Sequence, residues 1–179
     1  NKVIIGSFLG MSELSYYDLG EKIISAMKIP QSILGQTLFP KINNDKNIFF
    51  VKKVFRLSLL FNVIFTLFVI MFSKQIVLFI GGEQLLPSVM VVNILALSVP
   101  IIAMSNVFGV QLLIPFGKTK LFSQIIVSTG LIYLIQVSLI WLVWSVNIYS
   151  LSIITLTTEI IVTATMFYFC KKNKLWNNI

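Results

Sequence analysis

The sequence contains no histidine, and its only cysteine is Cys170. Without histidine, the chain lacks the usual general base, the commonest metal-ligating side chain and a member of most acyl-transfer triads. A single cysteine excludes an internal disulfide framework and most cysteine-based metal sites. We therefore expect no catalytic residue, no metal site and no cofactor, and we expect that the protein is not an enzyme.

Charged residues are scarce as well. They make up 11% of the 179 residues, against about 25% in an average globular protein, whereas 57% of the residues are hydrophobic. A water-soluble domain of this length leaves roughly a third of its surface wet, so it could not hide so much apolar surface. The composition therefore predicts that a lipid bilayer surrounds much of the chain. The net charge of +8 comes from lysines beside apolar runs, which indicates membrane-edge charge and no nucleic-acid partner.

Five apolar segments reach the roughly 20 residues that cross ~30 Å of hydrocarbon. They cover about residues 14–39, 54–72, 86–114, 121–144 and 150–170. The opening "NKVIIGSFLG" is apolar but shorter, and we interpret it as the end of a further helix of a larger protein. We expect an all-α polytopic membrane protein, with about five transmembrane helices plus the end of a sixth, in a single bundle over residues 1–179.

The connections between these segments alternate in charge. The first, third and C-terminal ones are basic, the one at 73–85 carries only Lys74 and Glu83, and the fourth, "SVNIY", is uncharged. The positive-inside rule then predicts that the basic connections and the C-terminus lie in the cytoplasm. Trp141, Trp144 and Tyr149 would form an outer aromatic belt.

The first segment differs from the others because "YYDLGEKIISAMK" carries four charges. On a helix with 100° per residue, its polar side chains share an arc about 120° wide. We call these residues the polar stripe: Asp18, Glu21, Lys22, Ser25, Lys28, Ser32 and Gln36. A charge in hydrocarbon costs at least ~2.5 kcal/mol. The stripe must therefore face water, partner charges or both.

Two interpretations of the stripe remain open. In the first, Asp18–Lys22 and Glu21–Lys28 pair along the helix at the outer interface, beside belt tyrosines. In the second, the stripe lines a hydrophilic cavity between helices, and the substrate-binding residues are Lys22, Lys28, Asp18, Glu21, Ser25 and Tyr17. We favour the second, because the stripe continues deep along the segment.

The fifth segment holds one charge, Glu159. An intramembrane carboxylate is a candidate proton or ion site, and Asp18 is a second candidate; the alternative is a Glu that is neutral or hydrogen-bonded within helix packing. Pro30 and Pro100 lie inside spans, where each removes a backbone donor. We expect kinks there that serve gating.

Four stretches, in this order and spacing, resemble the C-terminal half of bacterial lipid-linked oligosaccharide flippases, the O-antigen (Wzx-type) transporters. They are "IIGSFLGMSELSYYDLGEKI", "LGQTLFPKI", "FIGGEQLLPSVMVVNILALSVP" and "SNVFGVQLLIPFGKTKLF". This family belongs to the superfamily of multidrug and toxin extrusion exporters. The resemblance covers nearly the whole chain, although none of the stretches is a catalytic signature.

The resemblance implies one bundle of a two-bundle carrier in the bacterial inner membrane. Such a carrier flips undecaprenyl-pyrophosphate-linked oligosaccharides by alternating access, for O-antigen and lipopolysaccharide biosynthesis. Its partners would be the bilayer, the N-terminal half of the transporter, a polysaccharide polymerase and a chain-length regulator. Lys22 and Lys28 suit the cationic cavity of this family, whereas Asp18 and Glu21 depart from it.

Other functions remain open. A multidrug or cation exporter of the same superfamily would favour an acidic cavity, whereas the charges of the stripe are balanced. A membrane glycosyltransferase or polymerase is less favoured, because the chain has no histidine and no long extramembrane loop. A non-transporting scaffold would be indifferent to loss of the stripe charges.

Overall fold

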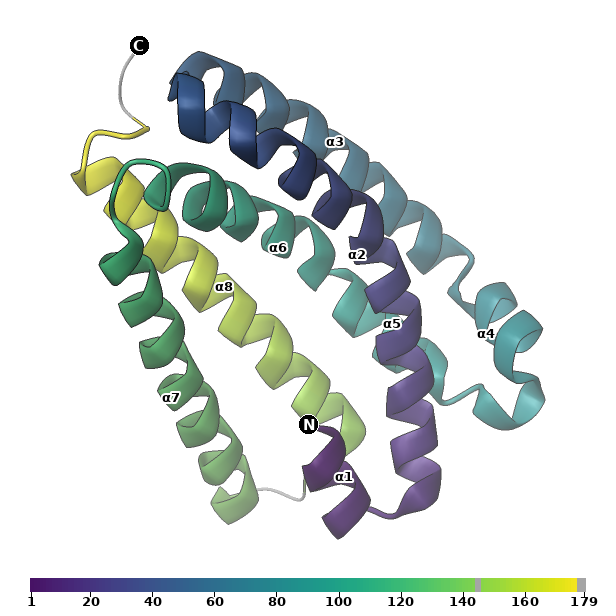
Figure 1. The fold of residues 1–179 in the computed structure, drawn as a ribbon. Coiled ribbons are helices and arrows are strands. Elements are labelled where there is room, and N and C mark those ends of the chain that lie inside the picture. The colour runs from purple at the N-terminus through teal and green to yellow at the C-terminus, as the bar shows by residue number, and fades with distance from the viewer. Residues whose placement is uncertain (144–145, 177–179) are drawn as a thin grey trace.

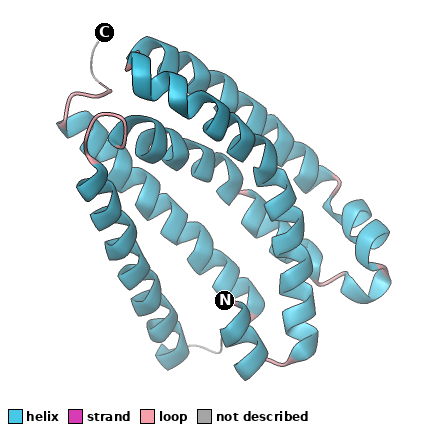
Figure 2. Ribbon diagram, viewed as in Figure 1, coloured by secondary structure: helices cyan, strands magenta, loops and turns pink. Residues whose placement is uncertain are grey.

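The computed structural model describes residues 1–143 and 146–176, and every regular element in these ranges is a helix (Figure 2). In chain order the elements are α1 (Lys2–Phe8), α2 (Met11–Asp45), α3 (Ile48–Met71), α4 (Ser73–Gly81), η1 (Glu83–Leu85), α5 (Ser88–Ala96), α6 (Ser98–Asn106), the π-helix η2 (Val107–Leu113), α7 (Thr119–Val143) and α8 (Ile148–Lys172). The predicted all-α class is confirmed.

The helix boundaries correct several expectations. The first segment does not end at residue 39, because α2 continues through Pro40 to Asp45. Proline removes one backbone bond, but Ile42 beyond it is buried in the core and holds the last turns in place. The connection at 73–85 is not a plain loop, since it contains α4 and η1. Trp144, the expected end of the fourth segment, lies outside the described residues.

The third segment is one run of three helical pieces. The α-helix breaks at Leu97, three residues before Pro100, and η2 continues with π-helical geometry. Pro100 has no N–H to donate to the carbonyl of Ala96, and the hydroxyl of Thr66 on α3 donates to that carbonyl instead, at 3.4 Å. A helix in a bilayer tolerates proline when a neighbour satisfies the freed backbone group in this way.

The helices form a bundle in which α2 packs on α5, α3 packs on α6, and α8 contacts α5, α6 and α7. Figure 1 shows the α2–α3 turn, the η2–α7 turn and the end of α8 at one end of the bundle, with α1 and α4 towards the other. The basic connections predicted to share one side of the membrane thus lie at one end of the molecule. Which side that end faces stays a prediction.

Two apolar clusters hold the bundle together. One lies towards the α1 end and includes Tyr17, Ile24 and Val92. The other lies towards the opposite end and includes Ile42 and Phe108. The polar stripe starts beside the first cluster and runs along α2 towards the second.

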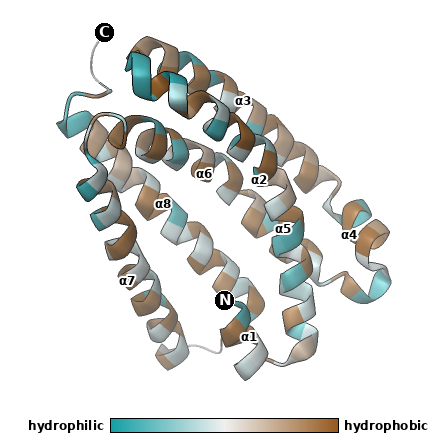
Figure 3. Ribbon diagram, viewed as in Figure 1, coloured by the Kyte–Doolittle hydropathy of each residue, from teal (hydrophilic) through white to brown (hydrophobic). Residues whose placement is uncertain are grey.

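The outer surface is strongly apolar. Figure 3 shows hydrophobic residues along α3 and α7, with hydrophilic ones near the helix ends and on α2. Among the described residues, four helical runs are long and apolar enough to cross a membrane: Ile48–Met71, Ser88–Leu113, Thr119–Leu142 and Ile148–Lys172. The chain is therefore an all-α polytopic membrane protein. The charged helix α2 is not among the four, so its predicted crossing stays a prediction.

Candidate functional site

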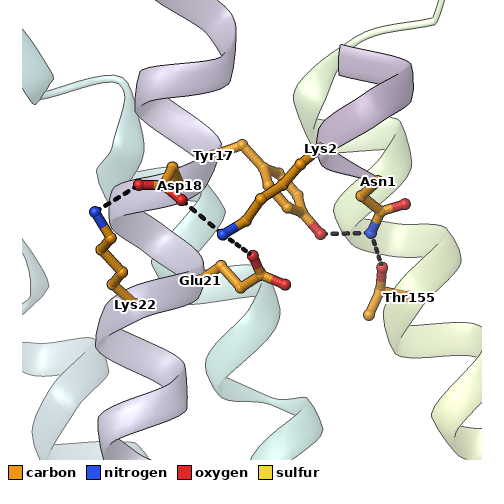
Figure 4. Close-up of polar contacts among 7 residues, drawn as sticks. All are labelled: Asn1, Lys2, Tyr17, Asp18, Glu21, Lys22 and Thr155. Carbon is orange, nitrogen blue, oxygen red and sulfur yellow. Dashed lines mark hydrogen bonds and ion pairs between the residues drawn. The ribbon is translucent and has the colours of Figure 1, made fainter. Parts of the chain in front are cut away.

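The N-terminal part of the polar stripe forms a compact ion cluster with α1 (Figure 4). The ammonium of Lys2 lies 2.6 Å from a carboxylate oxygen of Asp18 and 2.9 Å from one of Glu21. Lys22 approaches the other oxygen of Asp18 at 2.7 Å. These hydrogen bonds and charges raise the pKa of the Lys2 ammonium, with that from Asp18 the largest cause. Two lysines therefore balance two carboxylates.

This cluster corrects one expected pairing. Asp18 and Lys22 pair along the helix as expected, but Glu21 pairs with Lys2 and not with Lys28 among the described residues. Glu21 and Lys28 are seven residues apart, or about 10 Å along the helix axis, whereas α1 brings Lys2 directly alongside. Sequence reasoning did not single out Lys2, because its helix is separate and its partners are 16 and 19 residues away.

A neutral hydrogen-bond network adjoins the ion cluster. The side-chain amide of Asn1 donates to the hydroxyl of Tyr17 and, at 2.9 Å, to the hydroxyl of Thr155 on α8. The hydroxyl of Tyr133 on α7 donates to the amide oxygen of Asn1. The ring of Tyr17 is buried, with 1% of its surface exposed. The side-chain amide of Asn1, which directly precedes α1, thus joins α2, α7 and α8 and ties the buried Tyr17 to the rest of the bundle.

Beyond the ion cluster, the stripe faces away from the core. Ser25, Ser32 and Gln36 are exposed, and the Gln36 amide donates to the Ser32 hydroxyl at 3.1 Å. An open groove of about 370 Å³ lies between α2 and η2 beside this part of the stripe. Its lining residues are Ser32, Gly35, Gln36, Phe39, Asn106, Val110 and Ile114. The stripe is therefore accessible over its second half.

Lys28 differs from the other cations of the stripe. It is half-buried, and no carboxylate of the described residues lies within ion-pair distance of it. Glu159 on α8, also half-buried, is near enough for the charge of Lys28 to act on it. Lys28 and Glu159, which the sequence predicted separately, therefore lie on two helices within electrostatic range of each other but form no ion pair among the described residues.

The hydroxyls of Ser152, Thr155 and Thr163, on the same helix as Glu159, donate to backbone carbonyls. Ser152 and Thr155 donate to carbonyls one turn earlier on α8, and Thr163 donates to the carbonyl of Ile101 on α6 at 3.2 Å. Thr163 therefore helps to hold α8 against α6, and Thr155 meets Asn1. None of these three hydroxyls donates to Glu159, the acidic residue of α8.

Sequence reasoning missed a buried polar cluster between α2 and α3. The amide oxygen of Gln31 accepts from the hydroxyl of Ser58 and, at 3.1 Å, from the side-chain amide of Asn62. All three side chains are buried. The signal available in the sequence was the spacing of Ser58 and Asn62, which places two polar residues one turn apart in an apolar helix.

Comparisons with known proteins give a similarity to part of a longer protein. No protein-family model matches the chain, and no solved structure matches it. The chain is 25% identical to the Escherichia coli (strain K12) protein named "Putative O-antigen transporter", over 97% of this chain and 43% of that protein. The chain thus spans about two-fifths of the length of this curated relative. The chain is therefore a polytopic membrane protein that is similar to part of a protein named as a transporter.

Proposed function

We propose that this chain is one helical bundle of a flippase that moves undecaprenyl-pyrophosphate-linked oligosaccharides across the bacterial inner membrane, for O-antigen or another surface polysaccharide. The observation that carries the proposal is the polar stripe. From Asp18 to Gln36 it extends about 27 Å, close to the ~30 Å thickness of the hydrocarbon. Its exposed half suits the wall of a hydrophilic pathway, which the remaining part of the carrier would close.

Within this pathway, Lys28 is the residue best suited to hold the pyrophosphate. Lys22 is already paired with Asp18, whereas Lys28 has no direct ion pair among the described residues. A lysine ammonium binds phosphate oxygens through charge-assisted hydrogen bonds, which are about twice as strong as neutral ones. Ser25 and Ser32 lie one turn on either side of Lys28 and offer hydroxyls to the same headgroup.

Glu159 would then govern the availability of Lys28. An ionised Glu159 attracts the ammonium of Lys28 across the gap between α8 and α2. Uptake of a proton by Glu159 would remove this attraction, and the ammonium of Lys28 could then bind the pyrophosphate. Asp18, held by Lys2 and Lys22, is less suited to coupling because both of its carboxylate oxygens are engaged.

The remaining candidate residues hold the helices in place or allow them to bend in this proposal. Tyr17 fixes α2 against α7 and α8 through the side-chain amide of Asn1. The pairs of Asp18 and Glu21 with Lys2 fix α2 against α1. Figure 1 shows α2 changing direction between its purple N-terminal half and its dark-blue C-terminal half, with Pro30 inside the helix. That bend and the break before Pro100 are the points at which alternating access would flex the bundle.

Complementation tests the proposal. A host that lacks its own oligosaccharide flippase would receive this chain alone, or joined to the N-terminal half that the proposal requires, and surface polysaccharide would be measured. We expect restoration by the joined form. Failure of both forms, with each inserted and folded in the membrane, contradicts the flippase. Resistance to cationic drugs in the same strains would instead identify an exporter that uses Glu159.

A further inference from the structure

The first turns of α3 carry a second polar site, separate from the stripe. A pocket of about 420 Å³ opens there, within the ~300–1,000 Å³ range of small-molecule sites. Its lining residues are Phe49, Lys52, Lys53, Arg56 and Leu57. Three of these five carry a positive charge and none is a carboxylate, so the pocket favours an anion over a cation.

None of the three cations of this pocket forms an ion pair with a described carboxylate. Lys53 and Arg56 are exposed, and no described carboxylate lies within 4.0 Å of either. Lys52 lies over the ring of Trp176, with 5.3 Å between its ammonium and the ring centroid. Asp45, the nearest acidic residue in the sequence, is exposed at the end of α2 and does not line the pocket.

The position of the pocket indicates what kind of anion it meets. Its cations lie at the end of the bundle that gathers the basic connections (Figure 1). Directly after Arg56, the exposed face of α3 turns apolar, with Leu57, Leu60 and Ile64 all more than half exposed. A basic pocket at the start of a lipid-facing surface occupies the depth of phospholipid headgroups, and pockets of this kind bind anionic lipids.

We propose that this pocket binds the phosphate headgroup of an anionic phospholipid from the surrounding leaflet. Lys53 and Arg56, three residues apart on one face of α3, contact the phosphate, and Lys52 adds its charge from the side of Trp176. Phe49 and Leu57 border the headgroup, and an acyl chain follows the apolar face from Leu57 to Ile64. The site requires neither the polar stripe nor the proposed transport reaction.

Native mass spectrometry of the intact detergent-solubilised protein tests the site, with phosphatidylglycerol as the probe and phosphatidylcholine as the zwitterionic comparison. The variant Lys53→Gln/Arg56→Gln removes both phosphate contacts. Lys171→Gln/Lys172→Gln is the matched control, because it removes the same charge at the same end of the bundle. We expect the pocket variant to bind phosphatidylglycerol about 30-fold more weakly, since each cation contributes about fivefold, and the control to change by less than about threefold.

Equal losses in the two variants would mean that only general charge attracts the lipid, which overturns the site. Unchanged binding in the pocket variant overturns it as well. Undecaprenyl phosphate is the third probe: if its binding depends on the pocket while that of phosphatidylglycerol does not, the pocket receives substrate and the phospholipid assignment is wrong. The charge-conserving Lys53→Arg/Arg56→Lys variant should keep binding, and single Gln variants replace the double one if it does not fold.

Discussion

Gly20 of α2 lies so close to Val91 of α5 that a Cβ atom at position 20 would clash with the Val91 side chain. A Cβ atom added at Gly20 would lie 2.7 Å from Cγ1 and 3.3 Å from Cβ of Val91. Both Gly20 and Val91 are buried. Small residues at such a contact let two membrane helices approach closely, because packing rather than hydrophobicity drives their association in lipid. This contact sets the distance between the helix of the polar stripe and the core.

Gly20→Ala is therefore expected to destabilise the protein despite the better helix propensity of alanine. Overpacking costs about 1–3 kcal/mol, against a propensity gain of about 1 kcal/mol. The thermal unfolding midpoint in detergent should fall, and Val91→Ala should restore it in the double variant. Gly130→Ala on α7 is the control, because nothing lies within 4 Å of its added Cβ. Equal midpoints for the two single alanine variants would contradict the close contact.

The buried cluster of Gln31, Ser58 and Asn62 predicts a non-additive pair of substitutions. Gln31→Leu leaves the amide of Asn62 without its cross-helix acceptor, and a buried polar group that loses its partner costs about 1–3 kcal/mol in water and less in a membrane. Asn62→Leu alone should also destabilise. The double leucine variant should lose less stability than the sum of the two. Strict additivity in denaturant titrations would show that the amides do not interact.

The contribution of the Thr66 hydroxyl to stability should depend on whether residue 100 is proline. Thr66→Val removes the hydroxyl that donates to the Ala96 carbonyl and should cost about 0.5–1.5 kcal/mol. In a Pro100→Ala background, the new backbone N–H can supply that bond, so Thr66→Val should cost less there. The measurement is a double-mutant cycle on unfolding free energies. If Thr66→Val costs the same unfolding free energy in both backgrounds, the Thr66 hydroxyl does not compensate for the missing N–H of Pro100.

The two lysines of the stripe should respond differently in transport. Lys28→Ala is expected to lower surface polysaccharide about tenfold or more, since loss of a hydrogen bond to a charged group costs about 1.5–3 kcal/mol. Lys28→Arg should retain most activity. Lys22→Ala, whose side chain already pairs with Asp18, should have the smaller effect. Protein levels in the membrane are the control for each variant. Full activity of Lys28→Ala would show that Lys28 does not take part in the transport pathway.

The sequence by itself determined the class of this protein and the outline of its helices. Long apolar runs require backbone groups to be satisfied within each segment, so a lipid environment leaves helices as the structure for such runs. The polar stripe also followed from the sequence, because helical periodicity is a local property. The end of α2 did not follow, because Pro40 is a local stop signal and only the burial of Ile42 in the second cluster outweighs it.

Which polar and charged side chains pair with each other was decided only by the tertiary structure. Lys2 pairs with Glu21, and Gln31 bonds to Asn62, and in each case the two residues lie on different helices. The charge of Lys28 on α2 likewise acts on Glu159 on α8. The physical reason is that charge and hydrogen-bonding groups act over a few ångströms in space, whereas the sequence specifies only their order along each helix. The depth and angle at which helices pack, set by contacts such as Gly20 on Val91, choose which groups meet.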